Sequence, residues 1–150
     1  MRVDGSLGNV PDVTRLVENA SGLEAAGYDG IWSAETTHDP FLPLAIAAEH
    51  TERVELGTGI AVAFARNPMQ LANIGWDLQA LSEGRFILGL GSQISPHITK
   101  RFSMPWSKPA ARMREMISAT RAIWNTWLTD DELAFRGEFY THTLMTPFFM

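Results

Sequence analysis

The chain has 150 residues, of which 45% are hydrophobic, and it carries a formal net charge of -5. This length suffices for one domain with a substantial core, so we expect residues 1–150 to belong to one domain, without a second complete domain. The acidic balance argues against a nucleic-acid partner, because neutralising phosphates requires a clustered Lys/Arg surface. We interpret Arg112, Arg114 and Arg121 as the solvated face of a helix.

Three further classes of protein are disfavoured by what the sequence lacks. There is no cysteine, which excludes disulfides, thiolate catalysis and cysteine-ligated zinc. His38, His50, His97 and His142 lie far apart without paired ligand spacing, so no metal site is predicted. No apolar run approaches the roughly 18 residues of a spanning helix and no signal peptide is visible, so we expect a cytoplasmic protein without a membrane partner.

The chain order predicts four strand-then-helix units, which is typical of a parallel α/β sheet or barrel. Helix starts are marked by Asp39-Pro40 and Asn67-Pro68, and Gly27 and Gly84 follow predicted helix ends. Strands are expected over residues 2–7, 29–34, 53–61 and 85–89, with helices over about 12–26, from 40, from 68 and over about 110–127. Four units amount to roughly half of a closed (β/α)8 barrel, which takes about 250 residues.

Apolar residues at helical spacing predict the buried face of each helix. These residues are Val13, Leu16, Val17, Ala20 and Leu23, then Phe41, Leu44, Ala45 and Ala48, then Leu71, Ile74, Gly75, Leu78 and Leu81, and finally Met113, Met116, Ile117, Thr120, Ile123, Trp124 and Trp127. A long proline-containing connection over 90–109 is either a functional loop or a disordered segment. After the last helix, residues 133–136 and 138–142 predict a surface hairpin, and the apolar end over 146–150 would favour association.

Ligands of parallel α/β folds gather at the carboxyl ends of the strands, and the second predicted strand ends in a cluster of polar residues. Glu35 and His38 are the candidates for proton exchange, with Thr36 and Thr37 between them. Asp39 belongs to the same cluster, although its expected role is to cap the next helix.

Small residues gather at the next two strand ends, where a planar ring could lie. The third strand ends in Gly57, Gly59 and Ile60, and the fourth is followed by Gly91, Ser92 and Gln93. Neither set forms a dinucleotide fingerprint, because a third glycine and a following helix are missing. His97, Lys100 and Arg101 come next in the chain, and they either meet an anionic group or face water.

Several segments together resemble the bacterial luciferase-like flavin and deazaflavin enzymes. The resemblance rests on GYDGIWSAE, RVELGTGIAVAFARNP and GRFILGLGS, and it covers nearly the whole chain. The segment GSQISPHITKRFSMPWSKPAARMREM with RAIWNTW is similar to the coenzyme F420-dependent oxidoreductases. The resemblance implies a TIM barrel, present here as the first four βα units plus an insertion, so that residues 1–150 would be the truncated N-terminal half of one barrel domain.

The resemblance also implies where a coenzyme would lie. It places a non-proline cis peptide at Gly59-Ile60 behind the coenzyme ring, and Ser92 and Gln93 would form hydrogen bonds with the ring edge. Gly91 and His97 are further candidates for coenzyme binding. The proton would come from Glu35, His38 or His97, although the usual acidic residue followed directly by histidine is absent, since Thr36 follows Glu35.

The leading hypothesis from the sequence is an F420-dependent oxidoreductase that acts on an unknown small molecule, as a homodimer. An FMN-dependent luciferase-like monooxygenase is the enzyme alternative. From another class, the chain could be a non-catalytic half-barrel that associates through its open sheet edges.

Overall fold

The computed structural model describes residues 1–8 and 13–149, which fall into two compact units. The first unit holds residues 1–62 and 74–91, and the second holds residues 63–73 and 92–149. The predicted start of the first helix at residue 12 lies outside the described residues. Both units are discontinuous in sequence, and α3 spans the boundary between them.

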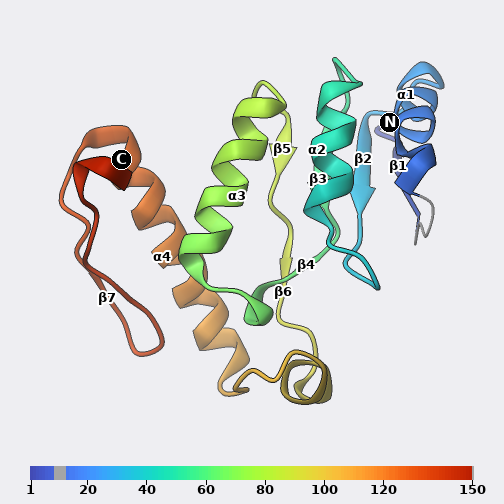
Figure 1. The fold of residues 1–150 in the computed structure, drawn as a ribbon. Helices are drawn as coiled ribbons and strands as arrows, with labels where there is room; N and C mark the ends of the chain where they lie inside the picture. Colours follow the sequence, from blue (N-terminus) through green and yellow to red (C-terminus); the bar gives the residue numbers. More distant parts are fainter. Residues whose placement is uncertain (9–12, 150) are drawn as a thin grey trace. The chain divides into compact units, whose positions relative to one another are not determined.

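The first unit is organised by a parallel sheet of four strands in the order β1-β2-β3-β5 (Figure 1). These strands are β1 (Asp4–Ser6), β2 (Gly30–Ser33), β3 (Glu55–Thr58) and β5 (Phe86–Ile87). Two shorter strands, β4 (Ala61–Val62) and β6 (Leu90–Gly91), pair in parallel as a separate ladder. The expected strand over 53–61 is therefore interrupted at residues 59 and 60, and the one expected over 85–89 is confined to 86–87.

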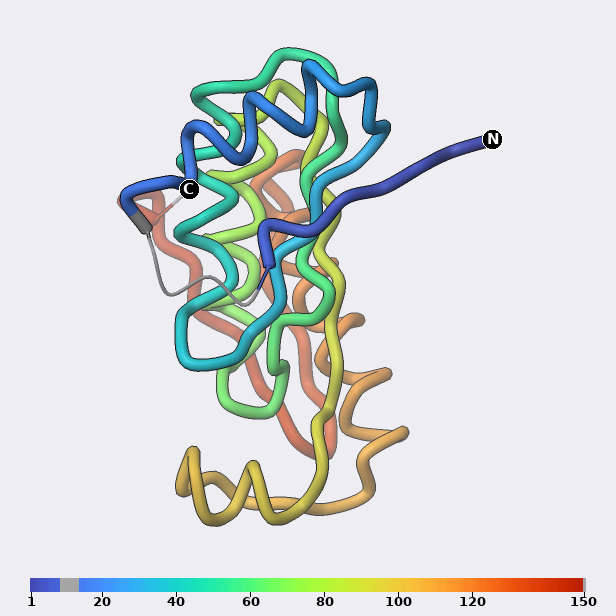
Figure 2. Tube along the Cα trace, turned by 90° about the vertical axis from the view of Figure 1, so that its right-hand side faces the viewer, coloured from blue at the N-terminus to red at the C-terminus, as the bar shows by residue number. Residues whose placement is uncertain are grey.

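Helices cover one face of this sheet. Figures 1 and 2 show α1 (Leu16–Ala25) and α2 (Phe41–Glu49) on the same side of the strands, and a 3-10 turn, Val13–Arg15, precedes α1. The third helix, α3 (Pro68–Leu81), contributes residues 74–81 to this unit. None of the helices in the described part of the chain is long and apolar enough to cross a membrane.

The capping signals in the sequence are confirmed. The Asp39 carboxylate accepts the Phe41 amide at 2.8 Å, and the Asn67 side chain accepts the Gln70 amide at 3.0 Å. The Gln70 side chain in turn accepts the Asn67 amide at 3.3 Å, which makes a reciprocal capping box. Gly27 and Gly84 both have φ of 88°, the left-handed conformation that ends a helix without a steric penalty.

Most residues of the predicted helix faces are buried or half-buried, but three residues at the margins of these faces are exposed. Leu16, Ala20, Leu44 and Leu71 are almost fully buried. The interpretation is wrong for Val17, Leu81 and Ile117, which are 38%, 40% and 37% exposed. A helix that meets its neighbours along one side buries only the centre of its apolar stripe, so residues at the margin of the stripe remain in solvent.

The register separates the two faces of the sheet. Ile31 pairs with Leu56 and Trp32 pairs with Gly57, and successive residues of a strand point to opposite faces. Ile31 and Leu56 are buried beneath the helices. Trp32 and Gly57 therefore share the opposite face, where the Trp32 indole N–H donates to the Asp4 carboxylate at 3.0 Å.

The second unit is organised by α4 (Pro109–Thr129) and an antiparallel hairpin of β7 (Phe135–Arg136) and β8 (Thr141–His142), which confirms the predicted hairpin. Its core includes Ala72, Ile123 and Leu133, against which Trp124 and Trp127 pack. The connection before α4 contains a π-helical turn, His97–Arg101. Two 3-10 turns, Ala63–Ala65 and Pro147–Phe149, complete the unit.

Arg112 is buried, which corrects its interpretation as part of a solvated helix face. Only 6% of it is exposed, and its guanidinium lies 4.5 Å from the centre of the Phe64 ring. It donates to the Tyr140 hydroxyl at 2.8 Å and to the Pro105 carbonyl at 2.6 Å. These acceptors and the aromatic face compensate for the loss of hydration, so Arg112 joins three segments that are distant in sequence.

Candidate functional site

The most distinctive backbone in the first unit lies just beyond the carboxyl end of β3. The peptide bond Gly59-Ile60 is cis, as the sequence resemblance predicted. Every residue from 56 to 64 is buried except these two, since Gly59 is exposed and Ile60 is half-buried. A buried strand therefore comes to the surface at two residues only, at the end of the sheet where parallel α/β folds bind ligands.

Glu35, which follows β2, holds this segment from one side. Its backbone N–H donates to the Ile60 carbonyl at 3.2 Å, and its carboxylate accepts the Val62 amide at 2.6 Å. The amide of Gly59 donates to the Ser33 carbonyl at 2.8 Å, which continues the pairing of β3 with β2. The structure thus brings two predicted site residues, Glu35 and Ile60, into direct contact.

Thr58 and Gly89 hold the same segment from the other side. The Thr58 hydroxyl donates to the Gly89 carbonyl at 2.7 Å and accepts the Gly89 amide at 2.8 Å. The Ala61 amide also donates to the Gly89 carbonyl, at 2.9 Å. The segment from Gly59 to Val62 is consequently held by hydrogen bonds to residues at or just after the end of β2 on one side and just after β5 on the other.

The glycines around this segment permit close approach of the chain to itself. A Cβ on Gly57 would lie 2.3 Å from the Trp32 indole, and one on Gly91 would lie 2.8 Å from the Ile60 side chain. A Cβ on Gly89 would lie 1.9 Å from the Thr58 carbonyl oxygen. The space expected in front of Gly57 for a ligand is therefore filled by Trp32 on that side, whereas the Ile60 surface stays accessible.

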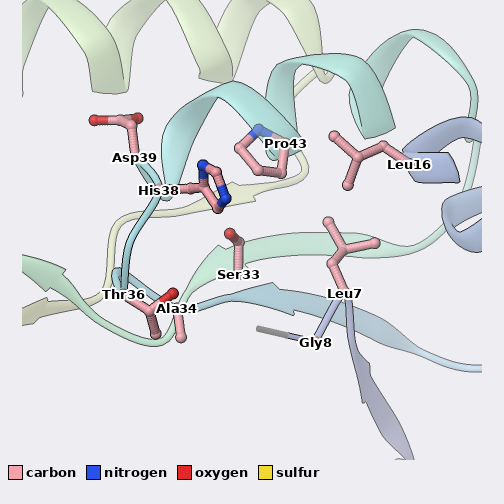
Figure 3. A pocket seen from close by; sticks show the side chains of 9 residues that line it. All are labelled: Leu7, Gly8, Leu16, Ser33, Ala34, Thr36, His38, Asp39 and Pro43. Atoms are coloured by element: carbon pink, nitrogen blue, oxygen red, sulfur yellow. The ribbon is translucent and has the colours of Figure 1, made fainter. Parts of the chain in front are cut away.

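His38 lines a small pocket at the carboxyl ends of β1 and β2. Figure 3 shows its imidazole over Ser33 and beside Pro43, with the Asp39 carboxylate pointing away. Ser33 is buried, and Leu7 and Leu16 close the apolar side of the pocket among the described residues. The pocket thus combines one titratable ring with two hydroxyls, those of Ser33 and Thr36, against an apolar wall.

The remaining predicted residues lie in the second unit, apart from Gly91 at the end of β6. The Ser92 hydroxyl donates to the Gln93 carbonyl at 3.1 Å, and a ring nitrogen of His97 lies 3.0 Å from the Gln93 side-chain oxygen. Gln93 adopts a left-handed φ of 60°. Gln93 and His97 therefore form one polar pair, while Lys100 and Arg101 are exposed.

Three residues that position the site escaped the sequence-based prediction: Trp32, Thr58 and Val62. Trp32 and Thr58 lie in short strands where an alternating pattern cannot be distinguished from a continuous apolar run. The role of Val62 depends on its backbone amide, which no residue type reveals. Within residues 1–8 and 13–149 no group of three or more metal-ligating side chains occurs.

The chain is similar to proteins of one known family over nearly its whole length. The sequence matches the luciferase-like monooxygenase family over residues 1–149. The chain belongs to this family. It is 62% identical over 149 residues to an uncharacterized protein of Mycobacterium tuberculosis, covering 99% of this chain and 43% of that protein. It is 33% identical over 144 residues to the F420-dependent glucose-6-phosphate dehydrogenase of Intrasporangium calvum, covering 85% of this chain and 42% of the relative.

Solved structures of the family share the fold. The FMN complex of the oxygenating constituent of 3,6-diketocamphane monooxygenase from Pseudomonas putida has a TM-score of 0.80 at 16% identity. It is matched over 97% of this chain and 45% of its own. The F420-dependent tetrahydromethanopterin reductase of Methanopyrus kandleri gives a TM-score of 0.78 at 19% identity, over 94% of this chain and 44% of its own. The chain thus has the α/β fold of about the first half of these TIM-barrel enzymes, and the described residues form no closed barrel. It spans less than half the length of the relatives compared.

Proposed function

We propose that the full-length protein is an oxidoreductase that transfers hydride between coenzyme F420 and a small organic substrate. The observation that carries this proposal is the 33% identity to an F420-dependent dehydrogenase over 85% of the chain. The surface at Gly59 and Ile60 supports it, because a flat ring needs an accessible, firmly held support at the carboxyl end of the sheet.

In this proposal each residue has a limited task. The deazaflavin, when bound, supplies the carbon that gives or takes hydride. Ile60 and Gly59 support the ring from behind, and Gly91 binds the coenzyme beside them. His38 exchanges a proton with the substrate from its pocket. In the second unit, Ser92, Gln93 and His97 are the candidates for further coenzyme contacts, and His97 is the alternative proton donor. We also propose that the protein acts as a homodimer in the cytoplasm.

A second candidate is an FMN-dependent monooxygenase. The FMN complex of the P. putida monooxygenase has the highest similarity of the two structures compared, with a TM-score of 0.80. Its 16% identity supports the fold alone, so the F420 assignment is preferred.

The two assignments are separated by titrating the full-length protein with F420 and with FMN in parallel, following the fluorescence of each coenzyme. We expect saturable F420 binding and at least tenfold weaker FMN binding. Tight FMN binding without an F420 response would reject the proposal in favour of the monooxygenase. A protein that binds neither coenzyme and self-associates in sedimentation would instead support the non-catalytic alternative.

A further inference from the structure

We infer that Glu35 is a positioning residue that holds the Ile60 segment in its binding shape, and that it is not the group that exchanges the proton. This inference rests on the proposed function, since it concerns how the chain presents Ile60 to a coenzyme. It assigns to Glu35 a role different from the acid-base role that its residue type predicts.

Glu35 forms hydrogen bonds with two residues of one short segment, Ile60 and Val62. Its backbone N–H donates to the carbonyl of Ile60 and its carboxylate accepts the amide of Val62, at 3.2 and 2.6 Å. Ala61 lies between the two hydrogen-bonded residues, so Glu35 alone holds the chain on both sides of Ala61. Hydrogen bonds between a carboxylate and a backbone amide are stronger than neutral ones.

Among the described residues, β4 has a strand partner on the side of β6 but none on the side of β2. The last pair of β2 with β3 is Ser33 with Thr58, so the regular ladder ends one residue before Gly59. The next strand, β4, pairs with β6 on the side that faces away from β2. Glu35 therefore takes the place of a neighbouring strand along β4, which matters because Ala61 and Val62 are 0% and 1% exposed and a buried amide that loses its acceptor is costly.

After β2, the exposed acid-base side chain at the pocket is His38 and not Glu35. The pocket after β2 is lined by His38, Ser33 and Thr36, and Glu35 does not line it (Figure 3). His38 is exposed, whereas Glu35 is half-buried with its carboxylate on the Val62 amide. A residue bonded to the backbone of the binding segment is suited to hold it, and a residue that faces the pocket is suited to exchange protons.

The test compares Glu35→Gln with Glu35→Ala in the full-length protein. The glutamine carbonyl oxygen can still accept the Val62 amide but cannot exchange a proton as an acid, so the two roles predict opposite results for Glu35→Gln. We expect Glu35→Gln to keep the F420 dissociation constant within about threefold and to leave the pH profile of turnover unchanged. Glu35→Ala should weaken F420 binding at least tenfold and speed hydrogen exchange of the Val62 amide at least tenfold.

Two outcomes would overturn the inference. One is a Glu35→Gln protein that binds F420 normally, protects the Val62 amide and yet loses turnover, because a proton-transfer role would then be indicated. The other is a Glu35→Ala protein whose Val62 amide exchanges as slowly as in the wild type. If Glu35→Ala does not fold, Glu35→Met preserves side-chain volume without a carboxylate or amide oxygen, and the same two readouts apply.

The exchange measurement separates this inference from the proposed function. It is made without coenzyme, so a wild-type protein that binds no F420 would contradict the function while the exchange rates still decide whether Glu35 holds the segment. Glu24→Gln serves as the matched control, because Glu24 also accepts backbone amides but lies at the opposite end of β3. Its substitution should leave both the Val62 exchange rate and F420 binding unchanged.

Discussion

The two ends of β3 use the same chemistry for different purposes. Before the strand, the Glu24 carboxylate accepts the amides of Glu52, Arg53 and Val54 at 2.7 to 3.2 Å. After the strand, the Glu35 carboxylate accepts the amide of Val62. At the amino end the bonds fasten a chain reversal, whereas at the carboxyl end they hold Gly59 and Ile60 at the surface. A carboxylate that accepts backbone amides thus secures the residues before β3 at one end and the Gly59-Ile60 segment after it at the other.

The largest expected loss of stability comes from adding a side-chain atom near the carboxyl end of β3. Gly89→Ala would place a Cβ 1.9 Å from the Thr58 carbonyl oxygen, so the backbone at one of these two residues must shift. We expect the free energy of unfolding to fall by about 3 kcal/mol, measured by urea denaturation. Gly22→Ala is the control, because Gly22 lies in α1 with nothing within 4 Å of the added Cβ, and it should stabilise by about 0.5 to 1 kcal/mol. Equal effects of the two substitutions would contradict the close strand contact.

The second largest expected effect is on stability, and it comes from Arg85 at the amino end of β3. The Arg85 guanidinium donates to the carbonyls of Ala48, Thr51 and Val54 and to the Thr51 hydroxyl, at 2.8 to 3.3 Å. Arg85→Met keeps much of the side-chain volume but removes every donor, and we expect a loss of about 2 kcal/mol in the free energy of unfolding. F420 affinity should not change by more than about twofold, because Arg85 acts at the end of the sheet opposite to Ile60. A stable Arg85→Met protein with weakened coenzyme binding would contradict the expectation that the amino end of β3 affects stability alone.

A smaller effect at the same end depends on pH. Burial, the largest single influence, raises the pKa of Glu24, but the amides of Val54, Arg53 and Glu52 together lower it below its ordinary value of 4.5. The unfolded chain therefore binds the proton more readily, and the stabilisation by Glu24 is present above pH 4.5 and is lost as pH falls through the folded-state pKa. Because Glu24 is partly exposed and screened by solvent, we expect Glu24→Ala to cost about 1 kcal/mol at pH 7.

The check on this prediction is a pair of urea titrations at neutral and acidic pH. The difference in midpoint between Glu24→Ala and the wild type should shrink as the pH falls below 4.5. A difference that stays constant over this range would mean that the charged carboxylate is not what holds the three amides.

The smallest expected effect tests the Ile60 surface itself. Ile60→Val removes one methylene from a half-buried side chain, so stability should change by only about 0.5 kcal/mol. If a coenzyme ring lies on Ile60, the lost contact of about 0.8 kcal/mol corresponds to roughly fourfold weaker F420 binding. Ile87→Val, on an exposed side chain of β5, is the matched control and should leave binding unchanged. Identical affinities for Ile60→Val and the wild type would place the ring elsewhere.

Much of the fold could be predicted because its signals are local. Asp39 and Asn67 cap helices through side chains that reach only two or three residues along the chain, and Gly27 and Gly84 end helices through their own φ angles. The interpretation of Arg112 failed for the opposite reason. Its burial depends on Phe64, far away in the sequence, and a helical pattern contains no information about such a partner.

The candidate site could be predicted in position but not in detail. Glu35, His38 and Ile60 were identified because they follow predicted strands of a parallel sheet. The sequence could not show that the Glu35 carboxylate accepts the Val62 amide, since backbone groups look alike at every position. It also could not show that Trp32 covers Gly57, because that contact requires the register between β2 and β3.

The amino-acid sequence by itself determined the alternation of strands and helices, the helix ends and the family, because these follow from periodicity, capping residues and motifs within short stretches. Only the tertiary structure decided which neighbours the small residues accommodate and what each polar side chain is bonded to. The physical reason is that close approach and hydrogen bonding depend on register and distance between strands that are separated by 25 or more residues, as for Glu35 with Val62 and Thr58 with Gly89.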